Sequence, residues 1–210
     1  AICVYPLLVE EIRLKLNVPG VSLAAVGAGF PSSQTFLAVK IAECGMLVKK
    51  GADEVDVVLS VGRFLAGEYL EVLNELILIR EATTGAKLKV ILETGLLKSA
   101  SNIRLASLIA MEAGADFIKT STGKIPVAAT PEAVNVMAKA IRDFYALTGK
   151  AVGLKAAGGI VTVEDAVSYY FLINQLLGEE WLNHNRFRIG ASRLANNLLS
   201  NILAEEVHYF

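Results

Sequence analysis

The sequence has few cysteines, almost no net charge and no long apolar run, and each absence excludes a class of protein. Among 210 residues, only Cys3 and Cys44 are cysteines, too few for a disulfide framework and without the spacing of a metal site. We expect both to be reduced thiols that pack as small hydrophobic side chains in a cytoplasmic protein. The net charge of −1 gives no electrostatic footprint for nucleic acid or for an anionic membrane.

Apolar residues are abundant, but they occur in short runs. They make up 54% of the chain, and the mean hydropathy is +0.51. No run approaches the roughly 18 apolar residues of a membrane span. We also expect no signal peptide, because no basic segment followed by an apolar core opens the sequence. Short apolar runs are typical of parallel strands that are covered on both faces, so the sequence predicts an α/β fold.

Seven of these runs are predicted to be strands. They are AICVY from residue 1, VSLAAVG from 21, EVDVVLS from 54, LKVILET from 88, DFIKTS from 116, AVGLKAA from 151 and FRIGAS from 187. Segments with helical periodicity lie between them, at 99–113, 130–149 and 162–178 among others, and begin at serine or threonine caps. Strands that alternate with helices indicate βα units and a parallel sheet.

The expected architecture is a (β/α)8 barrel, or TIM barrel, formed as one domain by residues 1–210. Such a barrel has eight strands and typically about 250 residues. This chain has seven predicted strands and starts without Met inside an apolar run. We therefore expect the first βα unit of the barrel to be absent from this chain. A doubly wound open sheet is the structural alternative.

Three ionisable residues stand within strands that are otherwise apolar. Gly-Ala-Asp precedes a strand at 51–53 and again at 114–116, and aligning the two copies puts Asp56 level with Lys119. Alternate strands of a barrel contribute side chains to the same interior layer, so both residues are expected to point inward at one height. Lys155 lies on the next predicted strand, beside that of Lys119.

These three residues are suited to Schiff-base chemistry. Burial and a second ammonium group both disfavour the charged form of Lys119. A neutral amine attacks a carbonyl carbon, and Asp56 can balance charge and move protons. Two interpretations without catalysis stay open: a lysine that reaches solvent from a strand end, and a buried ion pair between Lys119 and Asp56.

Glycine-rich strand ends indicate an anion site. The two last predicted strands end in glycine, where backbone amides can approach a ligand closely. The loops after these strands and a helix N-terminus form the usual phosphate site of a barrel. The predicted site comprises Gly123, Lys124, Gly158, Gly159, Gly190 and Ser192.

The motifs resemble those of the deoxyribose-phosphate aldolases, in the same order and across essentially the whole chain. The matching stretches are ICVYP (2–6), GADEVDVV (51–58), KVILETG (89–95), GADFIKTSTGK (114–124), GLKAAGGI (153–160) and RIGAS (188–192). The resemblance implies a (β/α)8 barrel that reversibly cleaves 2-deoxy-D-ribose 5-phosphate to acetaldehyde and D-glyceraldehyde 3-phosphate. It implies a class I mechanism without metal or cofactor. Lys119 would be the Schiff-base lysine, Lys155 the partner that favours its neutral form, and Asp56 the proton-relay residue.

The chain also departs from the family pattern. The family's first strand, with an Asp and a Thr that face the substrate, has no counterpart here. Arg193 stands where many members have a small residue, and either adds a phosphate contact or points to solvent. Tyr209 is a candidate for the C-terminal tyrosine that some members use in proton transfer.

The expected partner is a small phosphorylated sugar, with a possible homodimer and neither nucleic acid nor membrane. Two other functions stay open. One is a non-catalytic phosphate-binding barrel that lacks the first strand, and the other is a different Schiff-base sugar-phosphate aldolase.

Overall fold

All seven predicted strands form, and they pair side by side in chain order. The computed structural model describes residues 1–209. The strands are β1 (Ile2–Val4), β2 (Leu23–Gly27), β3 (Glu54–Val58), β4 (Lys87–Ile91), β5 (Phe117–Lys119), β6 (Gly153–Ala157) and β7 (Phe187–Gly190). Every neighbouring pair is parallel. This sequential order is that of a barrel, whereas a doubly wound sheet reverses its strand order at a switch point.

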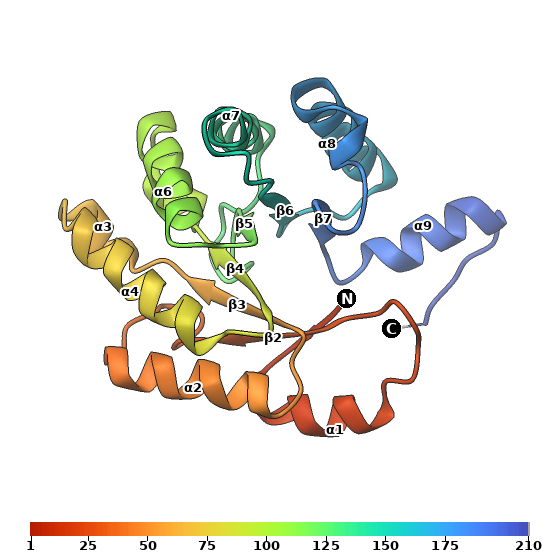
Figure 1. The fold of residues 1–210 in the computed structure, drawn as a ribbon. Coiled ribbons are helices and arrows are strands. Elements are labelled where there is room, and N and C mark those ends of the chain that lie inside the picture. The colour runs from red at the N-terminus through yellow and green to blue at the C-terminus, as the bar shows by residue number, and fades with distance from the viewer. Residues whose placement is uncertain (210) are drawn as a thin grey trace.

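Helices form an outer layer around the curled sheet (Figure 1). They are α1 (Val9–Lys15), α2 (Leu37–Lys49), α3 (Val61–Leu65), α4 (Tyr69–Ala82), α5 (Thr94–Leu97), α6 (Ala100–Glu112), α7 (Pro131–Thr148), α8 (Val163–Leu177) and α9 (Leu194–Leu203), with 3-10 turns at Pro6–Leu8 and Glu179–Trp181. The predicted caps form, because Ser99, Thr130 and Thr162 each accept a backbone N–H at a helix start. Within residues 1–209, no helix has the length and apolarity that a membrane crossing needs.

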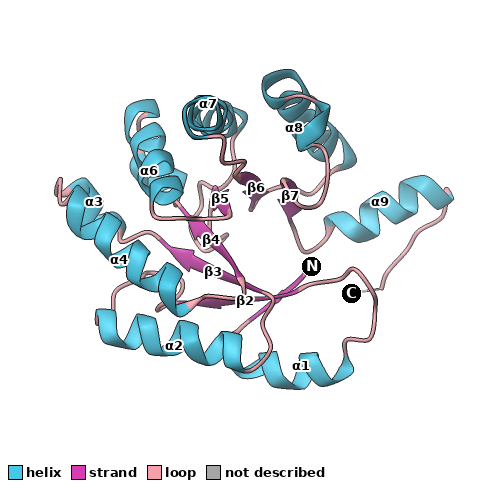
Figure 2. Ribbon diagram, viewed as in Figure 1, coloured by secondary structure: helices cyan, strands magenta, loops and turns pink. Residues whose placement is uncertain are grey.

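The sheet is a curled half-barrel whose two end strands are β1 and β7. Figure 2 shows the strands at the centre, with helices around their outer side. In the described residues, β1 pairs only with β2, and β7 pairs only with β6. The predicted parallel α/β architecture of TIM-barrel type is therefore confirmed as a seven-stranded arc.

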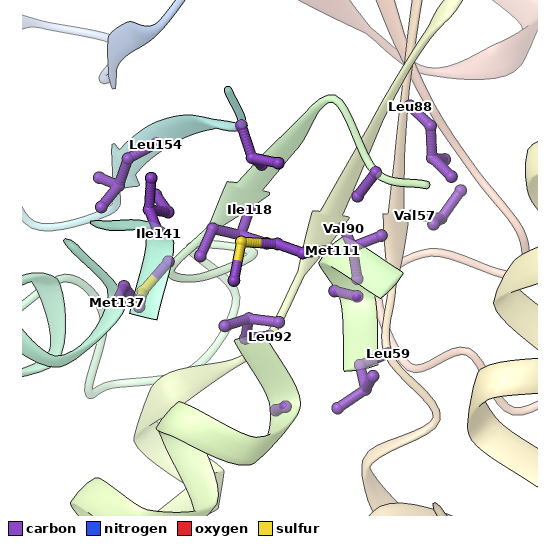
Figure 3. Close-up of a cluster of buried hydrophobic side chains, with 14 of the residues drawn as sticks. Val57, Leu59, Leu88, Val90, Leu92, Met111, Ile118, Met137, Ile141 and Leu154 are labelled. Carbon is purple, nitrogen blue, oxygen red and sulfur yellow. The ribbon is translucent and has the colours of Figure 1, made fainter. Parts of the chain in front are cut away.

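Alternate residues of each strand face opposite sides of this arc. Figure 3 shows the apolar side, where Val90 and Ile118 pack with methionines of α6 and α7. Because successive side chains of a strand point to opposite faces, the neighbours of these residues in the chain, Lys89 and Lys119, face the interior of the arc. The outer face thus carries the hydrophobic core, and the inner face is free to carry polar groups.

Candidate active site

Asp56 accepts hydrogen bonds from both of the lysines that were predicted to lie close to it. The Nζ atoms of Lys119 and Lys155 each donate a hydrogen bond to Oδ2 of Asp56 at 2.9 Å. The two lysines are register partners on β5 and β6. Asp56, on β3, is fully buried, and the lysines are 5% and 9% exposed. The structure therefore brings together the three residues that sequence analysis placed at one level.

A third lysine, which was not predicted from the sequence, belongs to this cluster. Lys89 on β4 is the register partner of Asp56 and is fully buried. Its Nζ donates to Oδ1 of Asp56 at 2.5 Å and lies 2.7 Å from Oε2 of Glu54. Glu54 also accepts two hydrogen bonds, at 2.8 and 3.2 Å, from the guanidinium group of Arg188 on β7. Glu54 was also missed, and the available signal for it was its two-residue spacing from Asp56, which puts both on one face of a strand.

Neighbouring cations keep both carboxyl groups ionised. Burial acts to raise the pKa of Asp56, but Lys89, Lys119 and Lys155 outweigh it and hold that pKa well below its usual range. Burial likewise acts to raise the pKa of Glu54, and Lys89 and Arg188 outweigh it and lower the pKa to about 2. With all lysines charged, Asp56 is thus an acceptor that orients amines.

Lys119 and Lys155 line a cavity of about 710 Å³. Its wall comes largely from the segments that follow β5, β6 and β7, at the carboxyl ends of the strands, where barrel enzymes carry their sites. All the residues predicted for the anion site line this cavity: Gly123, Lys124, Gly158, Gly159, Gly190 and Ser192. The structure thus joins the predicted amine site and the predicted anion site in one space.

Two glycines leave room that a larger residue would fill. A Cβ atom at Gly190 would lie 3.0 Å from Cε of Lys155, so glycine keeps the path of that side chain clear. A Cβ atom at Gly158 would lie 2.6 Å from Cβ of Ala128. Gly158 also has a φ of 86°, which favours glycine. The loop after β5 can therefore approach the end of β6 closely.

Glu93 supports the same loop. It is 3% exposed, and its carboxylate accepts hydrogen bonds from Oγ1 of Thr122 at 2.5 Å and from the backbone N–H of Thr122 at 3.2 Å. Thr122 lines the cavity. Glu93 therefore fixes the cavity wall immediately after Lys119.

The remaining predicted residues divide between the cavity and the surface. Arg193 lines the cavity, whereas Tyr209 is 71% exposed and its backbone N–H donates to Asn196. Cys44 is buried as expected, but Cys3 is exposed and lines the cavity. The prediction that both cysteines pack as hydrophobic side chains was therefore wrong for Cys3, because β1 is an end strand that leaves this residue open to the cavity.

Comparisons with known proteins match nearly the whole chain. A family model described as DeoC/LacD family aldolase matches residues 1–172. The deoxyribose-phosphate aldolases of Mus musculus and Homo sapiens are both 44% identical to this chain. The matches extend over 211 and 200 residues, which is 100% and 94% of the chain. The matches cover 65% and 63% of the two relatives, so the chain spans just under two thirds of the length of these curated relatives.

Solved structures show the same similarity. An aldolase named QR15 superposes with a TM-score of 0.77 at 30% identity, and the match covers 98% of this chain and 84% of QR15. The deoxyribose phosphate aldolase from Aeropyrum pernix, described as a unique tetrameric structure, superposes with a TM-score of 0.75 at 29% identity. That match covers 95% of this chain and 76% of the other.

Proposed function

The chain belongs to the DeoC/LacD aldolase family, and from this premise we propose that it reversibly cleaves 2-deoxy-D-ribose 5-phosphate to acetaldehyde and D-glyceraldehyde 3-phosphate. The observation that carries the proposal is the pair of buried lysines on one carboxylate oxygen beside a cavity. A structural ion pair needs only one cation, and a second one nearby favours the loss of a proton from either. The arrangement therefore places two amines and a carboxylate that can exchange protons beside one cavity.

The proposed reaction follows the class I route, which uses no metal or cofactor. Neutral Lys119 attacks the C1 aldehyde carbon of the sugar, and loss of one water gives an iminium ion. The C2–C3 bond then breaks. Its electron pair moves into the iminium, and the proton of the C3 hydroxyl group passes to a base, which releases D-glyceraldehyde 3-phosphate. The enamine left on Lys119 takes up a proton and one water and releases acetaldehyde.

Lys155 and Asp56 have supporting roles in this proposal. The charge of Lys155 favours the neutral form of Lys119, to which it lies close through their shared acceptor. Asp56 orients both amines and relays protons during carbinolamine dehydration and enamine protonation.

The mouth of the cavity suits the phosphate group of such a substrate. Lys124 and Arg193 bring positive charge to it, and Gly158 and Gly159 bring backbone amides without side chains. Ser192 lies just before α9, where the partial positive charge of the helix N-terminus favours an anion.

The proposal extends to the wider setting of the chain. An eighth strand between β7 and β1 would pair with both end strands and close the (β/α)8 barrel as a single domain. The two free thiols suit a cytoplasmic enzyme. A homodimer is the proposed assembly, and the tetramer reported for the Aeropyrum pernix protein is one precedent for oligomers in the family.

Mass spectrometry after borohydride reduction with acetaldehyde tests the function. Borohydride converts an iminium to a stable amine, so we expect a two-carbon adduct on the peptide that contains Lys119. Lys119→Ala should lose this adduct and reduce cleavage at least about 10³-fold while the fold is retained. Lys139→Ala, which changes an exposed lysine of α7, is the matched control. An adduct spread over surface lysines, or appreciable cleavage by Lys119→Ala, would refute the assignment.

A further inference from the structure

The interior of the half-barrel holds a connected row of charges that extends beyond the proposed catalytic residues. Arg188 pairs with Glu54, Glu54 with Lys89, and Lys89 with Asp56, at distances of 2.5 to 3.2 Å. The other carboxylate oxygen of Asp56, Oδ2, accepts hydrogen bonds from Lys119 and Lys155, the two lysines that line the cavity. Asp56 and Lys89 are fully buried, and Glu54 is 1% exposed. The proton state of one member therefore affects the others with little screening by solvent.

The row contains more cations than anions. Four members are basic by residue type and two are acidic, which gives an excess of two positive charges when all are ionised. Such an excess is costly to bury, and each anion reduces it. Glu54 binds both Lys89 and Arg188, and Arg188 also lines the cavity, so Glu54 offsets the charge of these two cations. Without Glu54, Lys89 would depend on Asp56 alone, and Asp56 would be less available to the cavity lysines.

We propose that Glu54 is a positioning residue for the aldol reaction, which, with Arg188, holds Lys89 against Asp56 and sets the charge balance in which Lys119 and Lys155 work. The inference rests on the proposed function. Glu54 touches neither of the cavity lysines in the hydrogen bonds and ion pairs of the described residues, so it acts through Lys89 and Asp56. Its effect is electrostatic as well as geometric, and these two parts can be separated by experiment.

The charges that can affect the pH profile of Lys119 are those of the groups that surround it. No titratable side chain comes from β2, whose sequence is Leu-Ala-Ala-Val-Gly. The charged and titratable groups on the other strands and around the cavity are Cys3 on β1, Glu54 and Asp56 on β3, Lys87 and Lys89 on β4, Lys155 on β6, Arg188 on β7, Lys124 and Arg193 in the following loops, and the amino group of Ala1. Substitutions of Glu54 and Arg188 change this set by one charge each and leave the cavity lysines and Asp56 in place.

The test compares Glu54→Gln, Arg188→Gln and the double variant with the parent protein. The readout is the initial rate of borohydride trapping of acetaldehyde on Lys119 as a function of pH. Glu54→Gln removes a negative charge, so the neutral amine should persist to lower pH, and we expect the midpoint of the profile to move down by about one unit. Arg188→Gln removes a positive charge and should move the midpoint up. The double variant restores the charge balance and should return it close to the parent value.

A purely structural role would lower trapping at every pH without opposite shifts of the midpoint. Unmoved midpoints, or shifts of the same sign in both single variants, would overturn the inference. Circular dichroism monitors the fold, and if Glu54→Gln does not fold, Arg188→Gln alone decides by the presence or absence of its upward shift. A parent protein that forms no Lys119 adduct refutes the proposed function and this inference together. An adduct with unmoved midpoints refutes this inference alone.

Discussion

At the scale of single residues, Lys155 is the cation that shares its acceptor oxygen with Lys119. Their Nζ atoms share Oδ2 of Asp56, each at 2.9 Å, and both side chains are buried. Two ammonium groups that share one acceptor disfavour each other's charged form. The charge of Lys155 is therefore separable from the nucleophilic role proposed for Lys119, because one can be removed while the other stays.

We expect Lys155→Leu to shift the pH profile of Schiff-base formation on Lys119 to higher pH by about one unit, because a neighbouring positive charge is lost. The pH dependence of the initial trapping rate measures this shift. Lys155→Arg is the matched control, since it retains the charge and should keep the midpoint near that of the parent. A Lys155→Leu profile with the parent midpoint would show that the two lysines are not coupled by charge.

Prediction from sequence at this scale succeeded where a polar residue interrupts an apolar run. Lys119 and Lys155 stand out in this way, and the repeated Gly-Ala-Asp linked Asp56 to Lys119. Glu54 is the first residue of its predicted strand and Lys89 the second residue of the strand predicted from 88, and a charged residue at such a position is typical of a solvated strand end. Only the register of β3 against β4, which no local pattern contains, shows that they meet inside the half-barrel.

At the scale of elements, a second buried ion pair connects α2 to α4. Nζ of Lys40 lies 2.8 Å from Oε1 of Glu75, and it also donates to Oγ of Ser33 and Ser60 at 2.8 and 2.9 Å. The serines belong to the loops after β2 and β3, so the cluster joins two helices and two loops. Strands and helix caps could be predicted from sequence because their signals are local. This cluster could not, because Lys40 and Glu75 are 35 residues apart.

Lys40→Met should lower the free energy of unfolding by about 3–5 kcal/mol, because it leaves the carboxylate of Glu75 buried without its cation. Lys40 is 1% exposed and Glu75 6% exposed, so solvent compensates poorly for the lost partner. Urea denaturation measures the change. The control is the double variant Lys40→Met/Glu75→Leu, which removes both charges and should recover most of the loss. Strictly additive effects of the two single substitutions would contradict the proposed coupling.

At the scale of the whole molecule, the number and order of the strands followed from the alternation of apolar runs and helical segments. The curvature of the sheet brings Arg188 of β7 to Glu54 of β3, which are 134 residues apart. The sequence alone carries no local signal for such a contact, because it depends on the summed twist and tilt of all the strands between them. The interior ion pairs therefore form only in the assembled sheet, and they make its stability depend on pH.

The direction of this pH dependence follows from the pKa of Glu54, which is lowered from its ordinary value of 4.5 to about 2 in the folded protein. A group with a lower pKa in the folded state contributes stability that is fully present above the unfolded-state pKa. That contribution is lost as pH falls from about 4.5 through about 2. The pKa of Asp56 is also lowered, so it acts in the same sense. We therefore expect the urea midpoint of unfolding to fall steadily with pH across this window.

Glu54→Gln should flatten this dependence below about pH 4.5, because glutamine binds no proton in either the folded or the unfolded state. Glu112→Gln, which changes an exposed residue at the end of α6, is the matched control and should keep the slope of the parent protein. The comparison depends on the slope against pH, so it is unaffected by any constant loss of stability in Glu54→Gln. If Glu54→Gln lost stability with the parent slope, the carboxylate of Glu54 would not be a source of acid sensitivity, and the ion pairs with Lys89 and Arg188 would contribute little to holding the curled sheet together.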